Sequence, residues 1–183
     1  MIFTELDVAG VFTIDLEERS DDRGFFARSF CEDEFAAHGL AHEMVQSNLS
    51  FNHAAGTVRG MHMQQEPHGE VKLVRATRGS IIDVIVDMRP DSPTHLRHVA
   101  VELTEQNRRA LYVPIGFAHG YQTLTDRAEV LYQVSARYAP GFERGYRFDD
   151  PAFGIAWPLP VRVISEKDAA WPTLVTTETT AES

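Results

Sequence analysis

The stretch GTVRGMHMQQEPHGEVKLVRATRG, residues 56–79, combines strand-like apolar positions with many basic side chains. Strand positions that alternate between apolar and polar residues usually face a core on one side and water on the other. Here the polar positions are mostly cations or imidazoles: Arg59, His62, His68, Lys72 and Arg75. Such groups can hold an anionic ligand and move a proton, so this stretch predicts a binding or catalytic site.

A second stretch, residues 112–124, contains the pattern P-x-G-x-x-H in Pro114, Gly116 and His119. This pattern resembles the second conserved motif of cupin barrels, in which a tight turn precedes a strand that aims the histidine inward. The first cupin motif has the form H-x-H, whereas Met-Gln follows His62 in this chain. Because a metal site normally needs at least three protein ligands, the sequence favours a site without metal.

Composition restricts the classes of function. The 183 residues carry a formal net charge of −10, which argues against a nucleic-acid partner because binding phosphate backbones needs a basic face. Cys31 is the single cysteine, and it can form no disulfide within the chain. Residues 1–20 lack a secretory pattern, and no apolar run reaches membrane-spanning length. We therefore expect a cytoplasmic protein with no membrane partner, built as one domain over residues 1–175 with a polar tail at 176–183.

Strand signals dominate the chain. Segments rich in β-branched and aromatic residues, separated by turn residues, predict strands at 10–16, 70–77, 80–88, 98–104, 109–115 and 129–138. Residues 32–39 predict a short helix that ends at Gly39. Short strands at this spacing predict an all-β antiparallel sandwich or barrel with a few short helices. If the face of 80–88 that carries Asp83 lines the barrel, this carboxylate needs a partner.

Six blocks of the chain together resemble the dTDP-4-dehydrorhamnose 3,5-epimerase family, in the order of the family. They are RGMHMQ, KLVRATRGSIIDVIVDMRPDSPT, VPIGFAHGYQTL, VLYQVSARYAP, FDDPAFGIAWP and ISEKD, and the match extends from DDRGFF at 21–26 to 165–168. The resemblance implies a cupin-like double-stranded β-helix, or jelly-roll barrel, and a homodimer. It also implies no metal and no organic cofactor. The expected substrate is a nucleotide-diphosphate sugar with a 4-keto-6-deoxy ring.

Epimerisation next to a ketone needs a base on one face of the ring, an acid on the other, and a group that holds the enolate oxygen. Histidine suits the base, because the unperturbed pKa of imidazole lies near neutrality. By resemblance, His62 is the base, Asp168 is its hydrogen-bonded partner, and Tyr132 is the acid on the opposite face. Taken alone, Tyr132 also fits a core tyrosine of a strand. Gly60 could allow a bulge that turns both Arg59 and His62 inward.

The resemblance also implies a set of substrate contacts. Lys72 would lie near the keto oxygen, Arg23 would contact the diphosphate, and Tyr138 would stack on the base. The full set implied for substrate binding is Arg23, Arg28, Gln46, Asn48, Arg59, Lys72, His119, Tyr138, Glu143 and Lys167.

The chain also departs from the family pattern. Arg28 stands where the family usually has a glutamate, Met63 where an aromatic is common, and Ser47 within a usual QDN. These departures leave the nucleotide open and indicate a divergent branch of the epimerases. Two alternatives stay open besides the isomerase that epimerises C3, C5 or both. One is a metal-dependent cupin enzyme with His62 and His119 as ligands; the other is a non-catalytic nucleotide-sugar binding protein.

Overall fold

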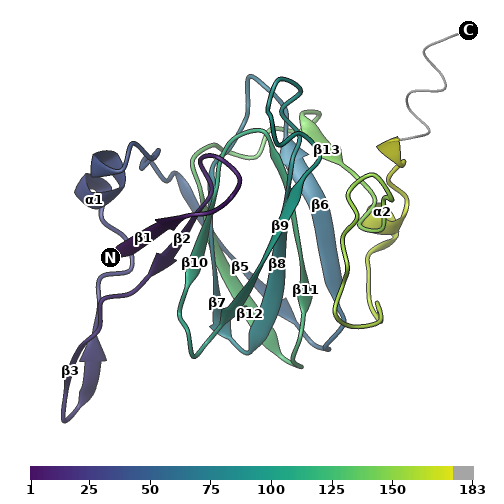
Figure 1. Cartoon of the computed structure of the whole chain (residues 1–183). Helices are drawn as coiled ribbons and strands as arrows, with labels where there is room; N and C mark the ends of the chain where they lie inside the picture. Colours follow the sequence, from purple (N-terminus) through teal and green to yellow (C-terminus); the bar gives the residue numbers. More distant parts are fainter. Residues whose placement is uncertain (175–183) are drawn as a thin grey trace, which may run out of the picture.

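Two antiparallel sheets form the body of the molecule. The structure is a computed structural model that describes residues 1–174, so the tail predicted at 176–183 lies outside the described residues. Within 1–174, one sheet has the strand order β1-β2-β10-β7-β12-β5, a second has the order β13-β6-β11-β8-β9, and β3 pairs with β4 as a separate hairpin. Figure 1 shows the barrel, with the β3 hairpin projecting away from it. The predicted all-β class is confirmed.

The elements have the following bounds, in chain order: β1 Ile2–Glu5, β2 Phe12–Asp15, β3 Arg19–Asp21, β4 Gly24–Phe26, α1 Glu32–Ala37, β5 Gln46–Asn52, β6 Val58–Gln64, β7 Lys72–Arg78, β8 Ser80–Asp87, β9 His98–Thr104, β10 Ala110–Val113, β11 Phe117–Thr123, β12 Ala128–Val134, β13 Glu143–Gly145 and α2 Glu166–Ala169.

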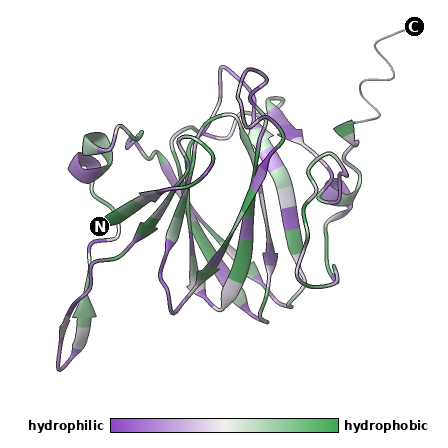
Figure 2. Cartoon of the chain, in the orientation of Figure 1, coloured by the Kyte–Doolittle hydropathy of each residue, from purple (hydrophilic) through white to green (hydrophobic). Residues whose placement is uncertain are grey.

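The main core lies between the two large sheets. Val74, Leu111 and Val130 contribute to it from the β7, β10 and β12 strands, and Ile85 and Leu103 from the β8 and β9 strands. Each of these five side chains is fully buried. Alternate residues of the same strands turn outward, and Figure 2 shows hydrophobic and hydrophilic bands following one another along β6 and β8. In β8 both faces are largely apolar, because Ile81 and Ile85 lie in the main core and Val84 and Val86 lie in a second core on the outer face.

Two smaller cores cover the outer faces of the sheets. Phe35 of α1 is completely buried against the six-stranded sheet, beside Leu73 and Tyr112. On the other sheet, Met61 and Val84 pack against residues of the C-terminal segment, among them Phe153. The C-terminal segment therefore lies along the five-stranded sheet, and Figure 1 shows α2 next to β6. Among residues 1–174, no helix combines the length and the apolar composition needed to cross a bilayer.

Candidate active site

A bulge in β6 brings two basic residues to the same face. His62 is opposite His119 in the β6–β11 pairing, and Arg59 is opposite Tyr121. Between these two pairs the chain advances by three residues on β6 but by only two on β11, so β6 contains one extra residue. Gly60 lies within this irregularity with φ of +118°, a conformation that favours glycine. A Cβ atom at Gly60 would lie 2.5 Å from the Cα atom of Gly120. The bulge predicted at Gly60 is confirmed, and Arg59 and His62 both line one cavity.

His62 is paired with an aspartate from the far end of the chain. Its Nε2 atom lies 2.6 Å from Oδ1 of Asp168, which is carried by α2. The other carboxylate oxygen accepts the N–H of Gly60 at 3.3 Å, and Ser165 caps the helix by accepting the N–H of Asp168 at 3.0 Å. Burial alone would raise the pKa of Asp168, but the hydrogen bond and charge of His62, with the contacts of Gly60 and Ser165, outweigh it and lower the pKa. Asp168 is therefore a carboxylate that can orient the ring of His62 and stabilise its protonated form.

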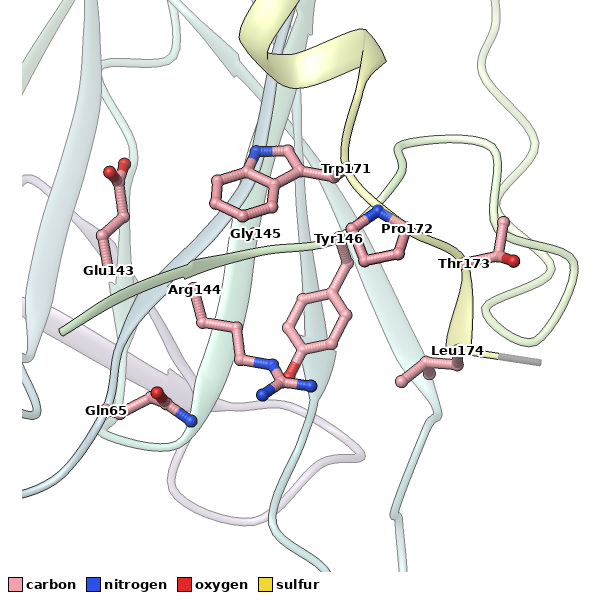
Figure 3. A pocket seen from close by; sticks show the side chains of 9 residues that line it. All are labelled: Gln65, Glu143, Arg144, Gly145, Tyr146, Trp171, Pro172, Thr173 and Leu174. Atoms are coloured by element: carbon pink, nitrogen blue, oxygen red, sulfur yellow. The ribbon is translucent and has the colours of Figure 1, made fainter. Parts of the chain in front are cut away.

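The short helix α2 is held in place by contacts on β13. Figure 3 shows the ring of Trp171 beside Gly145, at the edge of a pocket of about 280 Å³. A Cβ atom at Gly145 would lie 2.0 Å from Cε2 of Trp171, so only glycine leaves room for the indole. Lys167 forms an ion pair with Glu143 of β13. These contacts fix a four-residue helix that would not be stable alone, and thereby fix the position of Asp168.

The cavity that contains His62 has a volume of about 620 Å³ and lies between the two large sheets. Arg59, His62 and His119 line it from the five-stranded sheet, and Lys72 and Tyr132 line it from the six-stranded sheet. A second cavity of about 270 Å³ adjoins it and shares three lining residues, His62, Lys72 and Tyr132. The second cavity is also lined by Gln46, Asn48, Met63, Gln64, Glu70, Val134, Tyr138 and Glu143. The imidazole of His62, the ammonium of Lys72 and the phenol of Tyr132 thus lie at the junction of the two cavities.

Tyr132 lies on β12, opposite Asn48 of β5 and Val74 of β7. Val74 is a fully buried member of the main core, so this face of β12 points between the sheets. Burial is the largest influence on the phenol and raises its pKa; the charge of Glu70 raises it further, and that of Arg59 acts in the opposite direction. The phenol is therefore protonated at neutral pH, as a proton donor must be.

Four of the predicted substrate contacts, Lys72, Arg59, Tyr138 and Gln46, have partners within the site. The ammonium of Lys72 lies 3.2 Å from Glu70, and both side chains are about 12% exposed. The Nε atom of Arg59 donates to Oδ1 of Asn52 at 2.8 Å. The backbone N–H of Tyr138 donates to the side chain of Gln46 at 3.3 Å. Each of these contacts restricts a polar group that faces one of the cavities.

His119 forms a second histidine–aspartate pair. Its Nε2 atom lies 2.7 Å from Oδ1 of Asp83, and the side chain of Asp83 has no exposed surface. Asp83 lies on the inner face of β8, and His119 is the partner expected from the sequence for a carboxylate on that face. Within the described residues, Oδ2 of Asp83 has no hydrogen-bond partner. No three His, Cys, Asp or Glu side chains gather into a group that could hold a metal ion in residues 1–174.

Sequence reasoning missed several residues of the site. The hydroxyl of Tyr121 is 2.9 Å from Oγ of Ser50 and accepts a hydrogen bond from Asn52 at 3.2 Å. Tyr121 follows His119 by two positions on one strand, so period-two spacing could have identified it. Glu70 and Gln64 also line the second cavity, and neither had been assigned to the site.

Three of the predicted substrate contacts line neither cavity. One is Lys167, which pairs with Glu143 of the second cavity; the other two are arginines. Arg23 forms an ion pair with Asp21 at the tip of the β3–β4 hairpin, where its side chain is 89% exposed. Arg28 contacts Glu34 of α1 at 3.3 Å. Within the described part of one chain, neither arginine lines the hollows around His62.

Comparison with known proteins identifies the family. A profile of dTDP-4-dehydrorhamnose 3,5-epimerase matches residues 5–176. The curated enzyme of that name from Sinorhizobium fredii is 43% identical over 175 residues, which covers 95% of this chain and 90% of the relative. The corresponding enzyme of Methanothermobacter thermautotrophicus is 41% identical and covers 94% of both chains.

Solved structures agree in fold. The dTDP-4-dehydrorhamnose 3,5-epimerase of Bacillus anthracis, with TDP and PPi bound, gives a TM-score of 0.91 at 36% identity and covers 94% of this chain and 99% of its own. A 4-keto-6-deoxy sugar epimerase of Streptomyces spheroides gives 0.92 at 35% identity, over 99% and 91% of the two chains. A 3'-monoepimerase of Streptomyces bikiniensis, in complex with dTDP-quinovose, gives 0.87 at 33% identity, over 96% and 89%. The predicted cupin-like barrel is confirmed, and the isomerase is favoured over the metal-dependent and non-catalytic alternatives. As its motifs predicted, the chain belongs to the dTDP-4-dehydrorhamnose 3,5-epimerase family.

Proposed function

We propose that this protein epimerises C3, C5 or both in a dTDP-linked 4-keto-6-deoxy sugar, by acid–base catalysis through an enolate. The observation that carries the proposal is the cavity between the sheets, which the His62–Asp168 pair enters from one side and Tyr132 from the other. The names of the curated relatives support it, as do neighbouring structures that hold TDP or dTDP-quinovose.

In this proposal His62 removes the proton. The 4-keto group acidifies the neighbouring C–H bonds, because the carbanion delocalises onto the ketone oxygen. The Nε2 atom of His62 is hydrogen-bonded to Asp168, and its Nδ1 atom makes no hydrogen bond to any described residue. Nδ1 is thus the atom available to the substrate, and the carboxylate stabilises the imidazolium that forms when it takes the proton.

Lys72 and Tyr132 complete the reaction. The negative charge of the enolate lies on the former keto oxygen, and the ammonium of Lys72 at the junction of the cavities can stabilise it. Tyr132 belongs to the facing sheet, so it can protonate the carbanion on the face opposite His62. The raised pKa of Tyr132 keeps the phenol protonated for this step.

The second cavity suits the nucleotide. Tyr138 at its edge is 61% exposed and offers a ring on which a base can stack. Gln46 and Asn48 provide amide groups on the inner face of β5. Glu143 and Lys167, joined as an ion pair, lie at the same end of the site. These residues support a nucleotide diphosphate that extends from the junction towards Tyr138.

We further propose that the protein acts as a homodimer in the cytoplasm. The β3–β4 hairpin exposes Phe26 to 68%, and β5, at the end of its sheet, exposes Leu49 to 62%. A second copy whose hairpin covers β5 would bury both side chains and bring Arg23 towards the anionic substrate. Light scattering on the purified protein tests this, and Phe26→Asp is expected to shift the mass from dimer to monomer. The lone cysteine Cys31 supports the location, because disulfide-free chains suit a reducing compartment.

The activity is tested by incubation with a dTDP-linked 4-keto-6-deoxyhexose in D2O, with the label positions read by NMR. We expect deuterium next to the ketone, with inverted configuration, and full activity after dialysis against a strong chelator. The labelled carbons distinguish epimerisation at C3 alone from epimerisation at both centres. Nucleotide-sugar binding without any exchange would contradict the proposal and favour a binding protein; dependence on added metal would favour a metal enzyme.

A further inference from the structure

Glu70 lies inside the site although the proposed chemistry does not use it. It precedes β7 by two residues and lines the second cavity with Lys72 and Tyr132. Val71, between Glu70 and Lys72, is buried in the core on the other face of the sheet, so the two charged side chains share the inner face. Only about 12% of the side-chain surface of Glu70 is exposed. An acid this enclosed needs partners for its charge.

Both carboxylate oxygens of Glu70 have partners. Oε1 lies 3.2 Å from the ammonium of Lys72, and Oε2 accepts a hydrogen bond from Nε2 of Gln64 at 3.3 Å. The amide of Gln64 is itself anchored, because its Nε2 also contacts the carbonyl of His68 at 3.2 Å and its Oε1 accepts the N–H of Ala139 at 2.7 Å. Glu70 is therefore a rigid link between a fixed amide and the flexible stem of Lys72.

We propose that Glu70 is a positioning residue of the active site, which holds the ammonium of Lys72 at the junction of the two cavities and presents a negative charge near the phenol of Tyr132. The assignment rests on the proposed epimerase function. A lysine has four rotatable stem bonds, and an unrestrained ammonium would occupy many positions. Fixing it beforehand avoids that ordering cost when the enolate forms. The negative charge near the phenol raises the pKa of Tyr132 in addition to the effect of burial.

The first test compares the wild type with Glu70→Gln at pH 7. The amide keeps the shape of the side chain and can still contact Gln64, but it cannot hold the ammonium by charge. We expect kcat to fall about 10–100-fold, by analogy with the partners that orient metal-ligating side chains, with KM nearly unchanged. Glu129→Gln is the matched control, because Glu129 contacts Thr77 on the exposed end of β12. Unchanged kcat in E70Q, or an equal fall in E129Q, would overturn the proposal.

A double-mutant cycle tests whether Glu70 acts through Lys72. If it does, E70Q adds little to the loss of kcat that Lys72→Ala already causes at pH 7. Effects that multiply in the double variant would show that Glu70 acts separately, and would contradict the positioning role. Glu70→Asp, which keeps the charge on a shorter stem, provides a second variant should E70Q fold poorly. We expect E70D to lower kcat while leaving the titration of Tyr132 as in the wild type.

The charge near the phenol is tested without turnover. Protein labelled with ¹³C at the tyrosine ring is titrated by NMR, and the Tyr132→Phe spectrum identifies the signal of Tyr132. Removal of a negative charge favours phenolate, so Tyr132 in E70Q should ionise at a lower pH than in the wild type. An unchanged titration would overturn this part of the inference. If the wild type epimerises no 4-keto sugar nucleotide, the proposed function fails, whereas the titration still decides whether the charge of Glu70 reaches Tyr132.

Discussion

Two histidine–aspartate pairs stand next to each other in this protein, and they differ in what surrounds them. His62 and His119 are opposite one another on β6 and β11, and their Nε2 atoms lie 2.6 and 2.7 Å from Asp168 and Asp83, respectively. The side chain of His62 is 29% exposed, whereas that of His119 is 10% exposed. The ring of His62 is therefore more open to a ligand than the ring of His119.

The aspartates differ more than the histidines. Asp168 comes from a four-residue helix outside the barrel wall, and both of its oxygens accept hydrogen bonds. Asp83 lies within β8, between β11 and β9 in the five-stranded sheet, and one of its oxygens has no partner among the described residues. A carboxylate on a separate helix can be exchanged with little effect on the barrel. We infer that activity depends chiefly on the His62 pair and stability chiefly on the His119 pair.

The largest effect is expected from His62→Ala. Loss of a general base typically lowers the rate about 10²–10⁴-fold, so both inversion and deuterium exchange should fall by that range. The unfolding midpoint should change little, because His62 faces a cavity. NMR of the sugar product in D2O measures the first quantity, and thermal unfolding measures the second. Undiminished exchange in this variant would exclude His62 as the base.

Tyr132→Phe separates the two faces of the ring. His62 remains able to remove a proton and to return a deuteron to the same face, so exchange should continue. Inversion should fall about 10²-fold or more, because the acid on the opposite face is missing. The ratio of exchange to inversion is read from the same NMR spectra. A variant that still inverts each centre as often as it exchanges it would assign the proton donor to another group.

Asp83→Ala should mainly lower the free energy of unfolding, whereas Asp168→Ala should mainly lower the activity. The Asp83 variant leaves the buried ring of His119 without its partner, which costs about 1–3 kcal/mol of unfolding free energy for an unsatisfied buried group. The Asp168 variant should lose less stability, because water in the cavity can reach His62, but it should lose far more activity. Urea unfolding and kcat on both variants check this. Equal losses of stability would mean that the two pairs do not differ as their surroundings suggest.

Much of the barrel could be predicted because its strands are rich in β-branched and aromatic residues and are separated by turn residues. The segments predicted at 80–88 and 98–104 correspond to β8 and β9, and the helix predicted at 32–39 to α1, which is followed by Gly39 with φ of +69°. β5 was missed for a physical reason. Its inner residues, such as Asn48, are polar because they face the site, and its outer residue Leu49 is apolar and exposed. This inverts the usual pattern of a strand.

The site was less accessible to sequence reasoning than the fold. The bulge at Gly60 could be anticipated, because strict alternation would have separated Arg59 from His62. Asp168 lies 106 positions from His62, on a helix too short to show any periodicity, and only the resemblance to a family indicated it. Glu70 carried no sequence signal of its own, because an acid next to a strand is usually a solvated residue. Its role depends on which side chains the barrel brings near it.

The smallest effect is expected for the pH dependence of stability in acid. Here the contribution of Asp168 can be compared with that of Asp87, which ends β8. Asp87 is fully buried and accepts hydrogen bonds from Arg89, Ser92 and Thr94. Burial acts to raise the pKa of Asp87, but the hydrogen bonds from these three residues outweigh it and lower the pKa strongly; the pKa of Asp168 is also lowered. A lowered pKa in the folded state gives stability that is complete above the unfolded value of about 3.9 and is lost as the pH falls through the folded pKa.

Urea unfolding at pH 7 and at pH 3 should therefore show a loss of stability in the wild type at the lower pH. Asp87→Asn should reduce that pH dependence markedly, because the asparagine takes up no proton, and Asp168→Asn should reduce it to a smaller extent. The expected order follows from the partners of the two carboxylates. Asp87 receives charge-assisted hydrogen bonds from an arginine, whereas Asp168 is paired with the imidazole of His62 beside a cavity. A greater reduction in the Asp168 variant would mean that the His62–Asp168 pair contributes more to the fold than the position of Asp168 outside the barrel wall indicates.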